Sequence, residues 1–237
     1  MAGKYLLEIS VETVEHAVAA ERGWADRLEL CNELAVGGLT PSAELMRTVR
    51  ARVKLPIFAM IRPRAGDFAY SAEEFAAMRG SIEVAKKLGM NGVVLGLLTA
   101  DGQVEVSLTR ELVEMAKPLP VTFHRAIDET ADVLEAVEDV AQTGASRILT
   151  SGGKATALEG AARIAEMVSR AGERIIILPG VGIHAGNVAE VARKTGAWEF
   201  HSGLSSVLAR GADGREFEAE VAKLAKRLPE MQFSGDR

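Results

Sequence analysis

The chain has 237 residues, of which 48% are hydrophobic and 26% charged, and it carries a formal net charge of −5. This balance is typical of a globular protein with a large core, and it argues against nucleic acid as a main partner, because phosphate binding needs concentrated lysine and arginine. No run is apolar for long enough to cross a membrane, no secretory signal opens the sequence, and the one cysteine cannot form an internal disulfide, so we expect a cytoplasmic protein.

Eight short apolar runs recur along the chain, each followed by a longer segment with helical spacing. In chain order, the predicted strands are residues 5–10, 27–31, 57–62, 92–96, 121–124, 147–151, 175–180 and 198–201. Between them, Thr40 and Pro41 predict a helix cap followed by proline at the first helical position, and Ser71 with Glu74 predicts a capping box. The last helix is expected over about 216–227.

Strands that alternate with helices predict the α/β class and a parallel sheet with right-handed crossovers. Eight such units are the number that closes a barrel, and the G-x-G-x-x-G pattern of an open doubly wound sheet is absent after the first strand. The sequence therefore predicts a single (β/α)8 TIM-type barrel over residues 1–237, with a polar tail that frays from about residue 228.

Side chains alternate between the two faces of a strand, so each predicted strand divides its residues between the helices and the barrel lumen. In the first strand, Leu7 and Ile9 face the helices, whereas Glu8 and Ser10 face inward. The same parity sends inward Arg27, Glu29, Cys31, Met60, Arg62, Thr122, His124, Glu199 and His201. These polar groups gather where barrel active sites lie, and they indicate either a structural network or a pocket for a small polar or anionic ligand.

Acid–base chemistry is the first function that the inward residues suggest. The stretch PVTFHRAID, residues 120–128, aims a histidine out of the end of a short strand. Histidine exchanges protons near neutral pH, and nearby carboxylates assist it. The predicted catalytic residues are Glu8, Glu29, His124 and His201.

Three turns suggest an anion site. IRPRAGDF carries two arginines, and LPGVGIHAGN and HSGLSS are turns with glycine after the last two strands, where barrels often bind phosphate. The predicted anion contacts are Arg62, Arg64, Gly180, Gly182, Ser202 and Gly203. The alternative is a charged surface loop and tight turns that need glycine only for their backbone conformation.

A metal is the other option for the lumen. Cys31, Met60, His124 and His201 include soft ligands that could hold copper(I). No CxxC, HxxxH or HExxH spacing supports a metal site, and a lone cysteine equally fits a small buried residue. Among the inward residues, Cys31 is the candidate for a metal ligand, because a thiolate is a soft donor.

Nine stretches, in order over about residues 5–205, resemble the CutC family: ADRLELC, GGLTPS, MIRPRAGDF, YS, PVTFHRAID, RILTSGG, ALEG, LPGVGI and EFHSG. The resemblance implies a TIM-type barrel, a cytoplasmic location, homo-oligomers and a role in copper homeostasis. It also implies copper binding by two cysteines that end the first two strands. Cys31 matches the second position, whereas Ser10 stands at the first. No arginine follows His201 closely, and Val181 stands where some members have glycine.

Three hypotheses remain open. The resemblance implies a copper-binding or copper-handling protein, with copper(I) as its metal. The residues themselves favour an enzyme that acts on a small anionic or sugar-like metabolite, with His124 as acid–base and Arg62 in the anion clamp. The third hypothesis is an interaction scaffold with a vestigial site.

Overall fold

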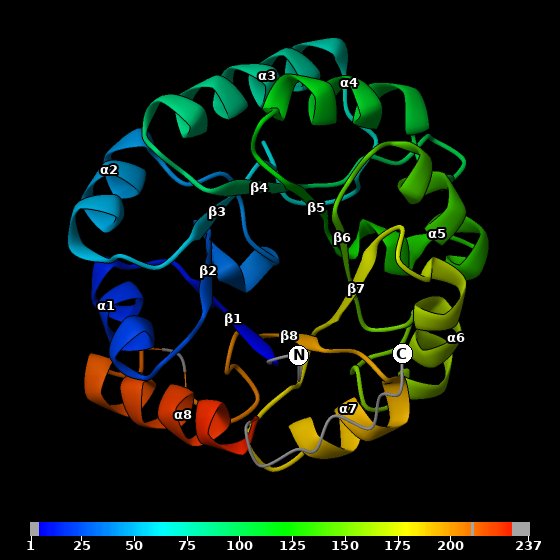
Figure 1. The fold of residues 1–237 in the computed structure, drawn as a ribbon. Helices are drawn as coiled ribbons and strands as arrows, with labels where there is room; N and C mark the ends of the chain where they lie inside the picture. The colour runs from blue at the N-terminus through cyan, green and yellow to red at the C-terminus, as the bar shows by residue number, and fades with distance from the viewer. Residues whose placement is uncertain (1–4, 210, 229–237) are drawn as a thin grey trace.

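A computed structural model describes residues 5–209 and 211–228, which form a ring of parallel strands surrounded by helices (Figure 1). The strands are β1 Leu6–Val11, β2 Arg27–Leu30, β3 Ile57–Met60, β4 Gly92–Leu95, β5 Val121–Phe123, β6 Arg147–Thr150, β7 Ile176–Pro179 and β8 Glu199–Ser202. The helices are α1 Val14–Arg22, α2 Ala43–Arg52, α3 Ala72–Lys87, α4 Val106–Ala116, α5 Val133–Gln142, α6 Ala161–Ala171, α7 Val188–Thr195 and α8 Gly214–Arg227. Two short 3-10 helices, η1 Leu34–Val36 and η2 Arg125–Glu129, follow β2 and β5.

The strands pair in parallel in the order β7-β6-β5-β4-β3-β2-β1-β8. β7 and β8 end this order and face each other across the remaining gap in the ring (Figure 1). The predicted (β/α)8 TIM-type fold is therefore confirmed, as a nearly closed barrel. The expected fraying of the tail concerns residues 229–237, which lie outside the described part of the chain.

The predicted parity of the strands is confirmed in β1 and β2. Leu7, Ile9, Leu28 and Leu30 are buried within the core between strands and helices. The apolar stripes of the surrounding helices cover this outer face of the sheet, so both faces of the barrel wall are removed from water. In the described part of the chain, no helix combines the length and the apolar character needed to cross a bilayer.

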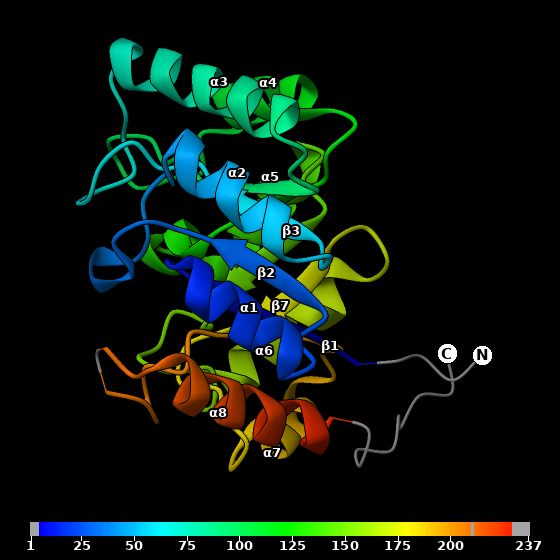
Figure 2. The ribbon, with the colours of Figure 1, turned by 90° about the vertical axis from the view of Figure 1, so that its left-hand side faces the viewer.

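Local side-chain bonds set where the helices begin. The capping box of Ser71 and Glu74 forms as predicted at the start of α3. The predicted cap at Thr40 is wrong, since α2 starts after Ser42, whose hydroxyl accepts from Leu45 N–H. Thr40 instead bonds the backbone of Arg62, which ties the loop after β2 to the end of β3. The strands point toward one end of the barrel, at the left of Figure 2, where the loops that follow them meet.

Candidate active site

A cavity of about 470 Å³ opens at the carboxyl ends of the strands. This volume lies in the range of pockets that bind small molecules. Its wall contains seven of the residues predicted for catalysis or anion binding: Glu29, Arg62, His124, Gly182, His201, Ser202 and Gly203. The strand parity and the parallel register bring these residues, distant in sequence, to one end of the barrel.

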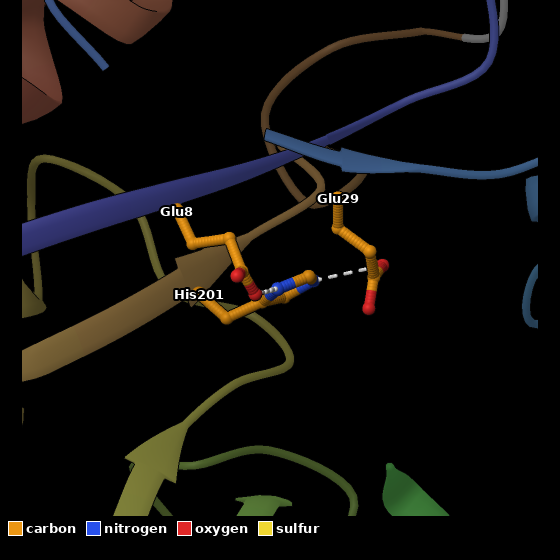
Figure 3. Close-up of side chains that lie close together, drawn as sticks. All are labelled: Glu8, Glu29 and His201. Carbon is orange, nitrogen blue, oxygen red and sulfur yellow. Dashed lines mark hydrogen bonds and ion pairs between the residues drawn. The ribbon is translucent and has the colours of Figure 1, made fainter. Parts of the chain in front are cut away.

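His201 lies between two carboxylates (Figure 3). Its Nδ1 is 2.8 Å from Glu8 Oε1, and its Nε2 is 3.9 Å from Glu29 Oε2. Glu8 is the direct neighbour of His201 in the register of β1 and β8. All three residues are at least nine-tenths buried, so water screens their charges little.

The surroundings give these three groups different protonation. Burial by itself raises the pKa of Glu8, but the charge of Arg27 and the bond with His201 outweigh it and lower that pKa to about 2. Burial lowers the pKa of His201, yet the charge of Glu29 and the contact with Glu8 raise it above its ordinary value. Burial raises the pKa of Glu29, which His201 offsets only in part. Glu8 therefore stays ionised and holds a proton on Nδ1 of His201, while Nε2 and Glu29 titrate together near the cavity.

Glu8 lies beneath the cavity and does not line it. Arg27 donates to Glu8 through Nε and to Glu199 through Nη2, at 2.7 Å in the second case. Arg147 donates to the same Glu199 carboxylate at 2.8 Å, and both guanidiniums lie over the ring of Phe58. These residues form a polar layer that fills the barrel below the cavity. The predicted catalytic Glu8 thus takes a positioning role, because it touches His201 and no cavity space.

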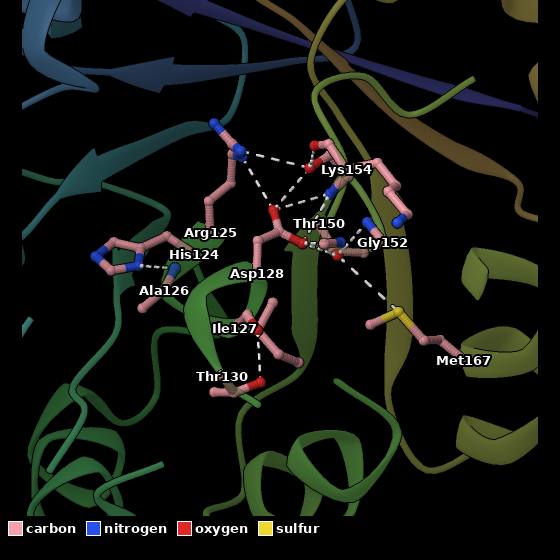
Figure 4. Close-up of polar contacts among 12 residues, drawn as sticks. His124, Arg125, Ala126, Ile127, Asp128, Thr130, Thr150, Gly152, Lys154 and Met167 are labelled. Atoms are coloured by element: carbon pink, nitrogen blue, oxygen red, sulfur yellow. Dashed lines mark hydrogen bonds and ion pairs between the residues drawn. The ribbon is translucent and has the colours of Figure 1, made fainter. Parts of the chain in front are cut away.

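His124 follows β5 and caps η2. Its Nδ1 accepts a hydrogen bond from Ala126 N–H at 3.2 Å (Figure 4). Burial and the charge of Arg62 lower the pKa of His124 to about 3. The imidazole is therefore neutral near pH 7, so the predicted proton exchange by His124 does not fit its surroundings. His201, between two carboxylates, has the surroundings that favour proton exchange.

Arg62 lines the cavity, but both terminal nitrogens of its guanidinium already donate to backbone carbonyls and are not free to bind an anion. Its Nη1 donates to Val36 O at 2.8 Å and to Gly38 O at 3.3 Å, and its Nη2 donates to Gly66 O at 2.9 Å. Its guanidinium also lies 4.8 Å from the ring centre of Phe68. Arg62 therefore joins the loops after β2 and β3 and contributes a buried positive charge to the cavity wall.

The structure does not bring Arg64 to the cavity. Its Nε donates to Glu74 at 2.6 Å and its Nη2 to Asp67 at 2.9 Å, while its guanidinium stacks on Tyr70. These contacts fold the loop before α3 onto itself. The alternative of a self-contained surface loop describes Arg64 better than an anion contact.

Asp128 organises the loop after β6 (Figure 4). Its carboxylate accepts from the Thr150 hydroxyl, from the N–H and hydroxyl of Ser151, and from Gly153 N–H. Arg125 Nε adds a fifth bond at 3.0 Å. The hydrogen bonds of this carboxylate thus fix the loop that places Gly153 and the following Lys154 in the cavity wall.

The two turns with glycine after β7 and β8 are only partly available to a ligand. Gly180 donates its N–H to Thr150 O at 2.9 Å, which continues the sheet, and it does not line the cavity. Gly182 and Gly203 do line it. Ser202 also lines it, but its hydroxyl donates to a backbone carbonyl of the preceding turn at 2.6 Å.

The residues near Cys31 do not fit a copper(I) centre. The thiol is fully buried and donates to Glu29 Oε2 at 3.4 Å, and burial raises its pKa well above the ordinary value, with the charge of Glu29 adding to the effect. A metal needs the thiolate. In the described part of the chain, Glu8, Glu29 and His201 form the one group of acidic, histidine or cysteine ligands within 4.8 Å of one another, and oxygen-rich sets suit harder ions than copper(I).

Sequence reasoning missed several residues that build the site. Arg27 was expected in the lumen without a role, and Arg147 and Asp128 were not assigned one. Arg147 had a visible signal, because it opens a strand with inward parity. Asp128 had only its spacing of three residues from Arg125 as a signal, since its other partners lie more than 20 residues away.

Comparisons with known proteins agree on one family. The model of the CutC family matches residues 5–206. A Xylella fastidiosa protein named as a family protein CutC is 48% identical over 203 residues, which cover 86% of this chain and 76% of that protein. The human protein named copper homeostasis protein cutC homolog is 44% identical over 205 residues, covering 86% of this chain and 75% of its own length.

A solved structure agrees with the sequence relatives. The crystal structure of a CutC protein from Streptococcus agalactiae matches with a TM-score of 0.79 and 29% identity. The match covers 84% of this chain and 98% of that chain. The barrel and its order of elements are therefore shared with that protein.

Proposed function

The chain belongs to the CutC family, and from that premise we propose that it is an enzyme that acts on a small anionic or sugar-like metabolite at the mouth of the barrel. In this proposal, His201 and Glu29 exchange protons with the ligand, and Glu8 positions His201. The predicted cytoplasmic location and homo-oligomer stay predictions.

The observation that carries this proposal is the position of His201 between Glu8 and Glu29 at a cavity of about 470 Å³. An ionised carboxylate on one ring nitrogen fixes the tautomer and leaves the other nitrogen to give or take a proton. Glu29, with its raised pKa, can hold the proton that His201 releases. Glu29 Oε1 is buried and has no hydrogen-bond partner in the described part of the chain, as is Glu199 Oε1 in the layer below, but only Glu29 lines the cavity where a ligand could supply one.

Acidic and basic side chains both line the cavity, and the acidic ones are Glu29, Asp128 and Glu129. Arg62, Arg125 and Lys154 all line it. Asp128 neutralises Arg125 in part, through the bond at 3.0 Å, whereas Lys154 forms no ion pair among the described residues. The glycine-lined turns after β7 and β8 let a ligand approach the backbone closely.

Copper handling is the second candidate, and it rests on the names of relatives such as the human copper homeostasis protein cutC homolog. The protonated Cys31 thiol and the absence of a second cysteine in the sequence weigh against a copper(I) site in the lumen. The enzyme proposal therefore describes this chain's own residues better.

A thermal-shift screen with a library of phosphorylated and carboxylated metabolites tests the proposal, run with and without copper(I). A ligand present at about 100 times its dissociation constant stabilises by about 2.7 kcal/mol, which raises the midpoint by roughly 5–10 °C for a domain of this size. Turnover of each stabilising compound is then compared in the wild type and in His201→Asn. The asparagine amide can keep the bond to Glu8 but lacks the second ring nitrogen.

We expect metabolite hits, and turnover that the His201→Asn variant loses while its unfolding midpoint changes little. A screen in which copper(I) alone stabilises the protein would support the second candidate. Equal turnover in both proteins would contradict the role of His201.

A further inference from the structure

We propose that His124 binds the ligand as a neutral hydrogen-bond donor through Nε2–H, and that ligands of this cavity carry a carbonyl oxygen at that point. This inference deepens the proposed function and rests on it, because it names the substrate class of the same cavity. It gives His124 a role that differs from proton transfer.

The hydrogen bond at Nδ1 decides which nitrogen carries the proton. Ala126 N–H is a donor, so Nδ1 of His124 must present a lone pair to it at 3.2 Å. A neutral imidazole has one N–H, which is then on Nε2. This tautomer follows from the 3-10 turn of η2, since the turn offers a backbone N–H that needs an acceptor.

The ring of His124 is held in this orientation. A Cβ added at Gly96 would lie 2.5 Å from Nδ1, so the chain passes the ring closely on that side. The ring of Phe68 lies 4.8 Å away, centre to centre, on another side. A ring turned by 180° would fill nearly the same space, but it would place Cδ2 where Nδ1 now accepts from Ala126 N–H and so lose that bond.

Nε2 is left for a ligand. His124 is 4% exposed and lines the cavity, while its Nε2 is itself buried and has no hydrogen-bond partner among the described residues. Nearly all buried N–H groups in proteins find an acceptor, so an acceptor is expected to come from the cavity.

The charges that act on His124 are positive. Arg62 and Arg125 both oppose its protonation, with Arg62 the stronger, and no acidic group counters them there. A neutral donor next to a buried guanidinium suits an oxygen that gains negative charge during a reaction. Glu29 and His201 lie in the same cavity and can take a proton from the ligand.

A carbonyl compound can use both groups of residues in this cavity, namely the donor His124 and the proton acceptors Glu29 and His201. When a C–H bond next to the carbonyl breaks, the proton goes to His201 Nε2 and the electron pair moves to the carbonyl oxygen, where His124 Nε2–H stabilises it. Return of the proton to carbon completes the cycle without an oxidant or a metal. The substrate class is therefore small anionic carbonyl compounds.

Nitrogen NMR of the histidine rings in the full chain tests the tautomer. We expect one ring that stays neutral, with its proton on Nε2, between about pH 5 and 8. An unperturbed histidine changes its charge in this pH range. This signal should vanish in His124→Asn. A proton on Nδ1, or titration of this ring near its ordinary pKa, would overturn the inference.

Two probes test the ligand class. Pyruvate and propionate differ in the carbonyl oxygen that pyruvate carries and propionate lacks. We expect the wild type to bind pyruvate about tenfold more tightly, as one hydrogen bond to a buried donor allows. His124→Asn keeps an acceptor for Ala126 N–H but loses the Nε2 donor, and should lose the preference. His124→Gln places an amide nitrogen near the position of Nε2 and should restore part of it.

The same probes separate this inference from the proposed function. Exchange of pyruvate methyl protons with deuterium from solvent reports proton transfer by His201. A pyruvate preference that depends on His124, without exchange in the wild type, would support the donor and contradict the enzyme. Exchange with a preference that is unchanged in His124→Asn would support the enzyme and overturn the donor, as would binding of neither probe.

Discussion

Two histidines at the same end of the barrel have pKa values shifted in opposite directions because their neighbours differ. His124 gives its Nδ1 lone pair to a backbone N–H and lies near Arg62, so its pKa falls to about 3. His201 lies between Glu8 and Glu29, whose charges raise its pKa despite burial. One cavity is therefore lined by a neutral histidine and by a histidine with a raised pKa, as the proposed acid–base chemistry requires.

The low pKa of His124 predicts a dependence of stability on pH. In the unfolded chain this histidine titrates near 6.5, and in the folded chain near 3. As pH falls from 6.5 toward 3, the unfolded state binds the proton first, so the free energy of unfolding decreases. Between pH 6.5 and 4.5 this group removes about 2 kcal/mol. His124→Asn should lack that loss, as urea unfolding at the two pH values would show.

The comparison with wild type at each pH is the control, since all other groups are shared by the two proteins. An equal loss of stability in wild type and variant would show that His124 protonates in the folded protein.

Copper(I) binding is expected to be weak, for a reason that lies in single residues. Cys31 is a buried, protonated thiol, and Ser10 occupies the position where a second cysteine would stand. In competition with a copper(I) chelator, the wild type should retain little metal compared with a two-cysteine relative. Ser10→Cys should increase retention, and Ser10→Ala should not. Tight stoichiometric binding by the wild type would contradict this expectation.

At the scale of elements, the cavity wall is built from loops that polar side chains tie to the strand ends. Thr40 and Arg62 join the loops after β2 and β3, and Asp128 joins η2 to the loop after β6. Such bonds satisfy backbone N–H and C=O groups of the loops, which lack the regular hydrogen bonds of helices and sheets. The barrel can therefore present polar wall residues from separate loops in a fixed arrangement.

Asp128→Asn should loosen the loop after β6. The amide has one accepting oxygen instead of two, so either the bonds that Oδ2 accepts from the Ser151 hydroxyl and Arg125 or those that Oδ1 accepts from the Thr150 hydroxyl and Gly153 N–H are lost. The expected cost is about 1–3 kcal/mol of the free energy of unfolding. Hydrogen exchange should become faster at the amides of Ser151 and Gly153.

Asp132→Asn is the matched control for this change. Asp132 caps α5 by accepting from Leu134 and Glu135, and asparagine caps helices about as well as aspartate. We expect this variant to exchange like the wild type. If the amides of Ser151 and Gly153 were as protected from exchange in Asp128→Asn as in the wild type, Asp128 would not be what holds the loop after β6.

At the scale of the whole molecule, the lumen has two layers. The lower layer pairs Arg27 and Arg147 with Glu8 and Glu199, and the upper layer is the cavity. The lower layer is a structural network of paired charges, whereas the pocket for a small ligand stays a prediction for the upper layer. The lower layer supplies the ionised Glu8 that orients His201 above it.

Arg27→Met should destabilise the barrel strongly at neutral pH. It leaves the buried carboxylates of Glu8 and Glu199 with one partner fewer each, and breaking a buried pair costs roughly 3–5 kcal/mol. Because the folded pKa of Glu8, about 2, lies below its ordinary 4.5, the stabilisation by Arg27 is present above pH 4.5 and is lost as pH falls toward 2. The difference in the free energy of unfolding between variant and wild type, measured by urea unfolding, should therefore become smaller below pH 4.5.

Arg174→Met is the control on the surface. Arg174 pairs with Glu138 where both side chains are open to solvent, and such pairs contribute little to stability. A similar, small effect of both substitutions would show that the buried layer is not essential to the fold.

The sequence by itself determined the barrel and the direction of its side chains. Strand parity is a local property with a period of two, so Glu8, Glu29, Arg62, His124 and His201 could be assigned to the lumen from the chain alone. Eight repeats of strand and helix left a closed barrel as the simplest arrangement. The start of α2 was missed because Ser42 and Thr40 are equally good caps, and a contact from β3 engages Thr40.

Tertiary structure decided which inward residues pair and which ones hold a proton. Arg27 meets Glu199 across 172 positions of sequence, and His201 meets Glu8 across 193. A pKa depends on burial and on charges a few ångströms away, and neither is a property of local sequence. For that reason the chain alone could propose two catalytic histidines, while only the folded barrel shows that the pKa of His124 is lowered and that of His201 raised.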